Sequence, residues 1–196
     1  VFIRSLASRG ALGGLHPHIL EIMAVMQAAG FDALLVETVG VGQSEIEIAG
    51  LADTTVVVVV PEAGDEVQTM KTGIMEIADI FVVNKADRPE ADAFVHNLQA
   101  MLAPAFSKRE QGIPILKTIA TAGDGITALA TAIDHHNGVL QQSERKYRLL
   151  AEKAYRLIQQ HRMQSVDKNQ LLQAVKAAAD TAGFNLFAFI EPYFTN

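Results

Sequence analysis

Four short runs of apolar, mostly β-branched residues constrain the fold of this chain more than any other feature. They lie at residues 33–37, 54–60, 80–84 and 113–119. Continuous apolar runs of this length are typical of strands that are buried on both faces, as in a parallel sheet. Stretches with helical spacing lie between and before them, at 16–29, 65–78, from 89 onward and from 126 onward. Strands that alternate with helices predict an α/β fold with a doubly wound parallel sheet.

The composition narrows the classes of protein that remain. The chain has 196 residues, of which 49% are hydrophobic and 19% charged, so a disordered chain is excluded. A net charge of −6 disfavours a nucleic-acid partner. The absence of Cys fits a reducing compartment, and we expect a cytoplasmic location. We expect no membrane association, because no apolar run approaches the ~18 residues that span a bilayer.

The character of the sequence changes after residue 138. Residues 143–182 have the pattern of two charged amphipathic helices, and residues 184–190 form an aromatic tail that either packs on the core or meets another chain. We therefore divide the chain into an α/β domain at 1–140 and a helical extension at 141–196, which is a candidate dimerisation region. His135 and His136, near the end of a predicted helix, are expected to interact with its dipole.

The motif with the most specific chemistry is N-K-A-D, which supplies Asn84, Lys85 and Asp87 at the end of a predicted buried strand. Ligands bind at the carboxyl edge of open parallel sheets. The Asp87 carboxylate is able to accept hydrogen bonds from the ring N–H and exocyclic amine of guanine, whereas adenine would leave it unpaired. The Lys85 stem is able to lie along the base, and Asn84 is able to join neighbouring loops. The alternative interpretation is a solvated loop.

A second motif, E-T-V-G, follows the run at 33–37. Glu37 is able to hold Mg²⁺ through water, because this ion keeps several waters and few carboxylates. Gly40 allows a backbone N–H to approach a γ-phosphate. The alternative is that Glu37 ends a strand and the glycines form a turn.

Two further segments contribute candidate residues. Asp65, Gln68 and Lys71 share one face of a predicted helix, where they would reach a nucleotide or a partner, or else remain solvated. Ala120 lies in a loop of small residues after the last strand. Its backbone N–H is placed to contact a guanine carbonyl oxygen, although such loops are usually simple turns.

Four features follow one another along the chain: E-T-V-G-V-G-Q-S-E, a Val-rich strand, G-D-E-x-Q-x-x-K and N-K-A-D. Together they resemble the MeaB/ArgK family of P-loop GTPases over about residues 1–140. Members of that family are chaperones of adenosylcobalamin-dependent acyl-CoA mutases of the methylmalonyl-CoA mutase type. The resemblance implies a P-loop NTPase-like parallel sheet with flanking helices, a C-terminal helical extension that forms a homodimer, and Mg²⁺-dependent hydrolysis of GTP to GDP and phosphate.

The resemblance also implies roles for the candidate residues. Glu37 would be the switch II acid near Mg²⁺, and Gly40 would sense the γ-phosphate. The residues that would read guanine are Asn84, Lys85 and Asp87, beside the Ala120 contact inferred above from its loop. The residues that would support hydrolysis and couple it to the mutase, in the segment called switch III, are Asp65, Gln68 and Lys71.

One departure from the family pattern is that the 196 residues contain no G-x-x-x-x-G-K-[ST] phosphate loop. We interpret the chain as truncated before switch I and expect it to hydrolyse GTP negligibly, because that loop supplies much of the positioning and charge stabilisation. Turnover at the rate of an intact GTPase would contradict this. Two alternatives are a non-catalytic scaffold or dimerisation module and a nickel-insertion metallochaperone GTPase. The latter needs His/Cys-rich ligands, and this chain has no Cys.

Overall fold

The computed structural model describes residues 1–7, 15–38, 48–61, 77–106, 112–180 and 183–194. The described chain forms two compact units, residues 1–153 and 154–196. The elements of the first unit are α1 (Ile19–Ala28), β1 (Val56–Val59), β2 (Ile80–Val83), α5 (Ala91–Phe106), β3 (Ile115–Lys117), α6 (Ile126–Gln141) and the start of α7 (Glu144–Met163). The second unit contains the rest of α7, α8 (Lys168–Ala179), α9 (Leu186–Ile190) and the 3-10 helix η2 (Glu191–Phe194).

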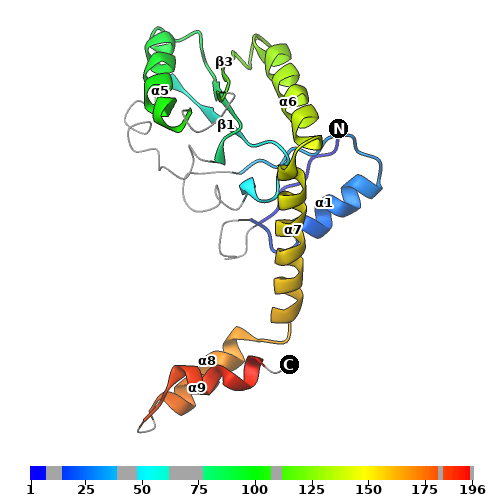
Figure 1. Cartoon of the computed structure of the whole chain (residues 1–196), viewed down its shortest axis with the longest axis vertical. Helices are drawn as coiled ribbons and strands as arrows, with labels where there is room; N and C mark the ends of the chain where they lie inside the picture. Colours follow the sequence, from blue (N-terminus) through cyan, green and yellow to red (C-terminus); the bar gives the residue numbers. More distant parts are fainter. Residues whose placement is uncertain (8–14, 39–47, 62–76, 107–111, 181–182, 195–196) are drawn as a thin grey trace. The chain divides into compact units, whose positions relative to one another are not determined.

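The three strands form a parallel sheet in the order β1-β2-β3. Val56 pairs with Ile80, and Phe81 pairs with Ile115, which places β2 in the centre. All four residues of β2 are buried. The strands lie between α5 and α6 in Figure 1. The α/β class, the parallel sheet and the flanking helices expected from the sequence are therefore confirmed.

Helix α5 covers one face of the sheet. Its apolar residues recur every fourth position, at Phe94, Leu98 and Leu102, so they form one stripe. This stripe packs with Phe81 and Val83 of β2 in the hydrophobic core. Burial of each such side chain contributes roughly 1.5–3 kcal/mol to folding. The helix that the sequence predicts after residue 89 is thus confirmed. Its packing holds β2 in place, and with it the loop that follows the carboxyl end of β2.

One predicted strand does not form. Residues 33–37 adopt irregular backbone, and the structure describes no sheet pairing for them. Leu35 is 94% exposed, so the run is not buried as a central strand would be. The prediction is wrong because an apolar run favours a strand but does not supply the neighbouring strand with which it must pair. Of the helix predicted at 65–78, residues 65–76 lie outside the described residues.

The C-terminal region has the helices that its pattern predicts, α7 and α8. Asp167 caps α8 by accepting hydrogen bonds from the backbone N–H groups of residues 169 and 170, at 2.8 and 2.9 Å. In the aromatic tail, the rings of Phe184 and Phe189 lie 5.9 Å apart, whereas Phe187 and Phe194 are exposed. Among the described helices, none is long and apolar enough to cross a membrane. The boundary at residue 140 stays a prediction.

Candidate functional site

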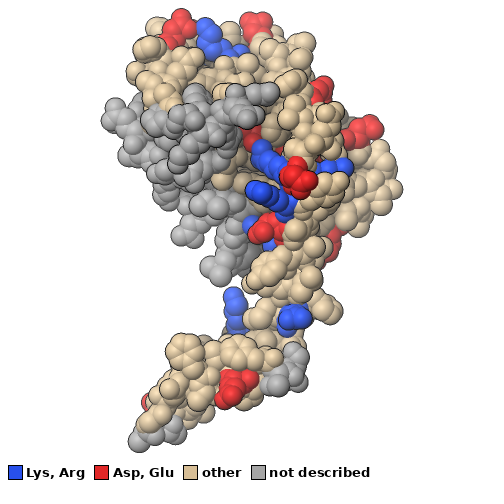
Figure 2. All heavy atoms as spheres, viewed as in Figure 1, with Lys and Arg blue, Asp and Glu red and all other residues tan. Residues whose placement is uncertain are grey.

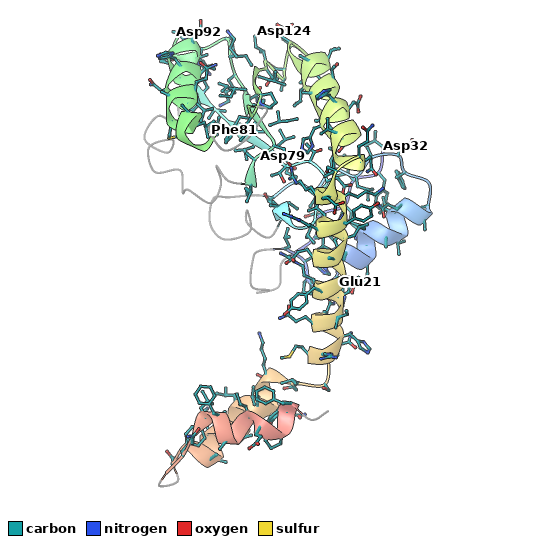
Figure 3. The ribbon with its side chains drawn as sticks, viewed as in Figure 1. Glu21, Asp32, Asp79, Phe81, Asp92 and Asp124 are labelled. Carbon is teal, nitrogen blue, oxygen red and sulfur yellow. The ribbon has the colours of Figure 1, made fainter. Side chains whose placement is uncertain are left out.

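The candidate site lies at the carboxyl edge of the sheet, where β2 and β3 end side by side. Residues 84–87 follow β2, and residues 118–125 follow β3. Because the strands are parallel, both segments leave the same edge. Figure 3 shows Asp92 and Asp124 at this end of the strands and Asp79 toward the other end. The sheet therefore brings together two of the segments that the sequence singled out.

Asn84 joins the strand ends to one another. Its backbone N–H donates to the Val59 carbonyl of the β1 end over 2.9 Å. Its side-chain Oδ1 accepts a hydrogen bond from the Thr118 hydroxyl and another from the Ala120 N–H, each 3.1 Å long. This one amide thus fixes the loop after β3 against the loop after β2, which is the linking function expected for Asn84.

Lys85 and Asp87 lie in a tight turn that presents both side chains at the surface. Lys85 has φ of +56°, a left-handed conformation that costs a non-glycine residue roughly 1–2 kcal/mol. The turn is held by the hydrogen bond from the Arg88 N–H to the Lys85 carbonyl, 3.1 Å, and by that from the Ala86 N–H to the Thr118 carbonyl, 3.0 Å. Backbone strain of this kind is concentrated at functional sites. The exposed Asp87 carboxylate is able to accept hydrogen bonds from a ligand.

Ala120 is exposed, and its N–H already donates to Asn84. A base carbonyl oxygen would therefore have to share or replace this hydrogen bond. Sequence reasoning missed Thr118, which is 3% exposed and donates its hydroxyl to the same amide oxygen. A β-branched residue with a hydroxyl at the end of a strand was the available signal, but the strand register was needed to bring Thr118 opposite Asn84.

The described contacts do not place the remaining candidate residues at the carboxyl edge of the sheet. Glu37 is exposed on irregular backbone, and no described contact joins it to residues 84–87. A single exposed carboxylate is compatible with holding Mg²⁺ through water. Within the described ranges there is no group of three or more His, Cys, Asp or Glu able to hold a metal ion. The candidates outside the described residues are Gly40, Asp65, Gln68 and Lys71.

The electrostatic network of the first unit lies at the opposite end of β2. Asp79, whose side chain is 1% exposed, binds Arg145 at the start of α7 through two hydrogen bonds, 2.6 Å from Oδ1 to Nη1 and 3.0 Å from Oδ2 to Nη2. Oδ2 also accepts the Thr55 N–H at 2.9 Å, and His136 Nε2 lies 3.5 Å from Oδ1. Asp79 itself is buried, and what Figure 2 shows over α7 is other, exposed Lys and Arg side chains next to Asp and Glu side chains. The network fixes the α6–α7 junction to the sheet.

These contacts determine the charge state of Asp79. Burial alone would raise the pKa of its carboxyl, but the hydrogen bonds from His136, Arg145 and the Thr55 N–H, with the charge of Arg145, lower the pKa from 3.8 to about 2. His136 also lies 2.8 Å from the Thr54 hydroxyl through Nδ1. We expected His136 to interact with the helix dipole, but the structure shows that it contacts Thr54, just before β1, and Asp79, just before β2.

Comparison with known proteins places these motifs in context. Residues 1–180 match the family model described as methylmalonyl Co-A mutase-associated GTPase MeaB. A protein of Pyrococcus abyssi that is named as a GTPase is 49% identical over 148 residues, which cover 74% of this chain and 46% of the relative. GTPase ArgK of Escherichia coli is 46% identical over 86 residues, 44% of this chain and 26% of ArgK.

The chain is also similar to a solved structure, described as the crystal structure of LAO/AO transport system kinase. The TM-score is 0.56 at 26% identity, and the match covers 89% of this chain and 60% of that one. The chain thus spans about half the length of the Pyrococcus relative that it matches. The family match extends to residue 180, beyond the segment near residue 140 over which the motifs alone carried the resemblance.

Proposed function

Because the chain belongs to the MeaB family of methylmalonyl-CoA mutase-associated GTPases, we propose that the sheet edge around Asn84 recognises the guanine base of GTP and GDP. The observation that carries this proposal is the joined pair of loops: Asn84 holds Ala120 at 3.1 Å while the neighbouring turn presents the Asp87 carboxylate. A base bound there would meet an acceptor from one loop and a donor from the other. Guanine has the complementary groups, because its N1–H and amine are donors and its O6 is an acceptor.

Each residue has a defined part in this proposal. Asp87 accepts the two guanine hydrogen bonds, and Lys85 packs its stem along the base. Ala120 offers its N–H to O6, which shares or replaces the hydrogen bond from this N–H to Asn84. Glu37 would hold Mg²⁺ through water, and when bound this ion would neutralise phosphate charge. Gly40 would contact the γ-phosphate, and the residues that would couple hydrolysis to a partner are Asp65, Gln68 and Lys71.

Base selectivity tests the proposal directly. Equilibrium dialysis of the chain against GDP and ADP, each at millimolar concentration, should give binding of GDP that is at least about tenfold tighter, since a hydrogen-bonding site discriminates strongly against a base that leaves it unpaired. We expect weak absolute affinity, because the sequence has no phosphate-loop motif. Equal retention of both nucleotides would contradict the assignment, whatever the affinity.

The larger proposal is that this GTPase acts with an adenosylcobalamin-dependent acyl-CoA mutase, as a cytoplasmic chaperone, and that its C-terminal helices form a homodimer. The family description supports the mutase. Exposed apolar side chains of residues 154–196, such as Tyr155, Ile158 and Phe187, support self-association. Sedimentation velocity of the chain alone and mixed with methylmalonyl-CoA mutase should show a dimer and a larger complex. A monomer in both samples would contradict both parts.

A further inference from the structure

Gly125 lies where the loop after β3 returns to the sheet and α6 begins. Its φ of +76° is left-handed, and its backbone packs directly on the end of β3. A Cβ atom built on Gly125 would meet the Lys117 carbonyl oxygen at less than contact distance and would lie 3.1 Å from both Cα and Cγ2 of Thr118. The close approach thus requires a residue without a side chain.

The neighbours of Gly125 are held too firmly to move aside. Lys117 is the last residue of β3 and pairs with Val83 of the central strand. The Thr118 N–H donates to the Val83 carbonyl over 2.9 Å, and Thr118 is 3% exposed. An added methyl group would therefore displace Gly125 and its loop rather than the strand.

The loop between these contacts is short and internally bonded. The Ile119 N–H donates to the Asp124 carbonyl over 3.0 Å, and the Ala122 N–H donates to the Ile119 carbonyl over 2.9 Å. Ala120 lies inside this closed segment and donates its own N–H to Asn84. A shift at Gly125 would consequently be transmitted to Ala120 through two hydrogen bonds.

We propose that Gly125 is a positioning residue for base recognition: because it has no side chain, the 118–125 loop closes against Lys117 and holds the Ala120 N–H at the Asn84 amide. Gly125 makes no contact with the base in this account and acts only through Ala120. The inference rests on the proposed recognition of guanine for its functional consequence, whereas its structural part is independent of any nucleotide.

Gly123 offers a matched control in the same loop. It has nearly the same conformation, with φ of +79°, but a Cβ there would have nothing within 4 Å. Replacing either glycine with Ala introduces the same left-handed strain. Only Gly125→Ala adds the collision with Lys117, so the difference between the two variants isolates the close approach.

The test is amide hydrogen exchange of the full chain, read residue by residue by NMR. In Gly125→Ala the Ala120 amide should exchange at least about tenfold faster than in Gly123→Ala, as expected when a hydrogen bond is lost, while the amides of β2 keep their protection. The preference for GDP over ADP should fall by a similar factor only in Gly125→Ala. Equal Ala120 exchange in both variants would overturn the proposal.

Two further outcomes are decided by the same design. If the wild-type chain shows no preference for GDP, the proposed function fails, and Ala120 exchange still decides whether Gly125 positions the loop. If Gly125→Ala does not fold, the comparison is made between Gly125→Asn and Gly123→Asn, because Asn tolerates positive φ better than Ala. Faster Ala120 exchange in Gly125→Asn alone supports the positioning role, and equal exchange contradicts it.

Discussion

Replacing Asp87 with Asn is expected to convert a guanine site into a xanthine site. The carboxylate is able to accept hydrogen bonds from both N1–H and the exocyclic amine of guanine, whereas Asn presents one acceptor and one donor. Xanthine has a carbonyl where guanine has the amine, so it matches Asn. We expect GDP binding to weaken at least about tenfold and xanthosine diphosphate binding to tighten, which changes their ratio by about 100-fold or more. Equilibrium dialysis with both nucleotides measures this ratio.

The matched control is Asp92→Asn. Asp92 lies at the same end of the strands (Figure 3), in the first turn of α5, and forms an exposed ion pair of 2.8 Å with Lys117. The substitution removes the same charge from the same edge, so it should leave the GDP to xanthosine diphosphate ratio unchanged. A ratio that shifts equally in both variants would mean that general electrostatics, and not contact with Asp87, selects the base.

Replacing Asp79 with Asn is expected to lower the free energy of unfolding by about 2–3 kcal/mol. The change removes the negative charge of residue 79, so the Arg145 guanidinium loses its partner carboxylate. The two hydrogen bonds between Arg145 and Asp79 are strong because both groups are charged. For a chain of this size the melting temperature should fall by roughly 5–10 °C. Thermal unfolding followed by circular dichroism measures the effect, with Asp92→Asn, an exposed pair, expected to change stability by under about 1 kcal/mol.

The pH dependence of the same pair gives a second measurement. The pKa of Asp79 is about 2 in the folded chain, below its ordinary value of 3.8. The ionised carboxylate therefore contributes about 2 kcal/mol to stability above pH 4, and this contribution is lost as the pH falls from about 4 to 2. The wild-type chain and Asp79→Asn should differ at pH 7 and converge toward pH 2. A constant difference across this range would show that Asp79 is not held ionised by its partners.

Apolar patterning predicted the strands β1, β2 and β3 and the α5 stripe of Phe94, Leu98 and Leu102, because periodicity is a local property of the sequence. Among the described strands, however, burial on both faces holds only for β2, since Val58 of β1 is 59% exposed. The run at 33–37 has the same pattern but no pairing in the described chain. Pairing depends on a neighbour elsewhere in the sequence, which composition and periodicity do not specify.

The candidate site was predictable where one motif carries the chemistry and not where distant residues meet. Asn84 and Asp87 were identified from N-K-A-D, yet the bond from Thr118 to Asn84 depends on the register of β3 against β2. Arg145 and Asp79 are 66 residues apart, and neither has a local pattern that indicates the other. The close approach of Gly125 likewise exists only once β3 and α6 are folded together.

The central claim is that guanine binds at the carboxyl edge of β2 and β3, and the location of nucleotide-induced NMR shifts tests it most directly. Titration of the ¹⁵N-labelled chain with GDP should shift the backbone amides of Asn84, Lys85, Asp87 and Ala120, while ADP at the same concentration leaves them in place. Shifts that are equal for the two nucleotides, or that fall outside residues 84–87 and 118–125, would contradict the account.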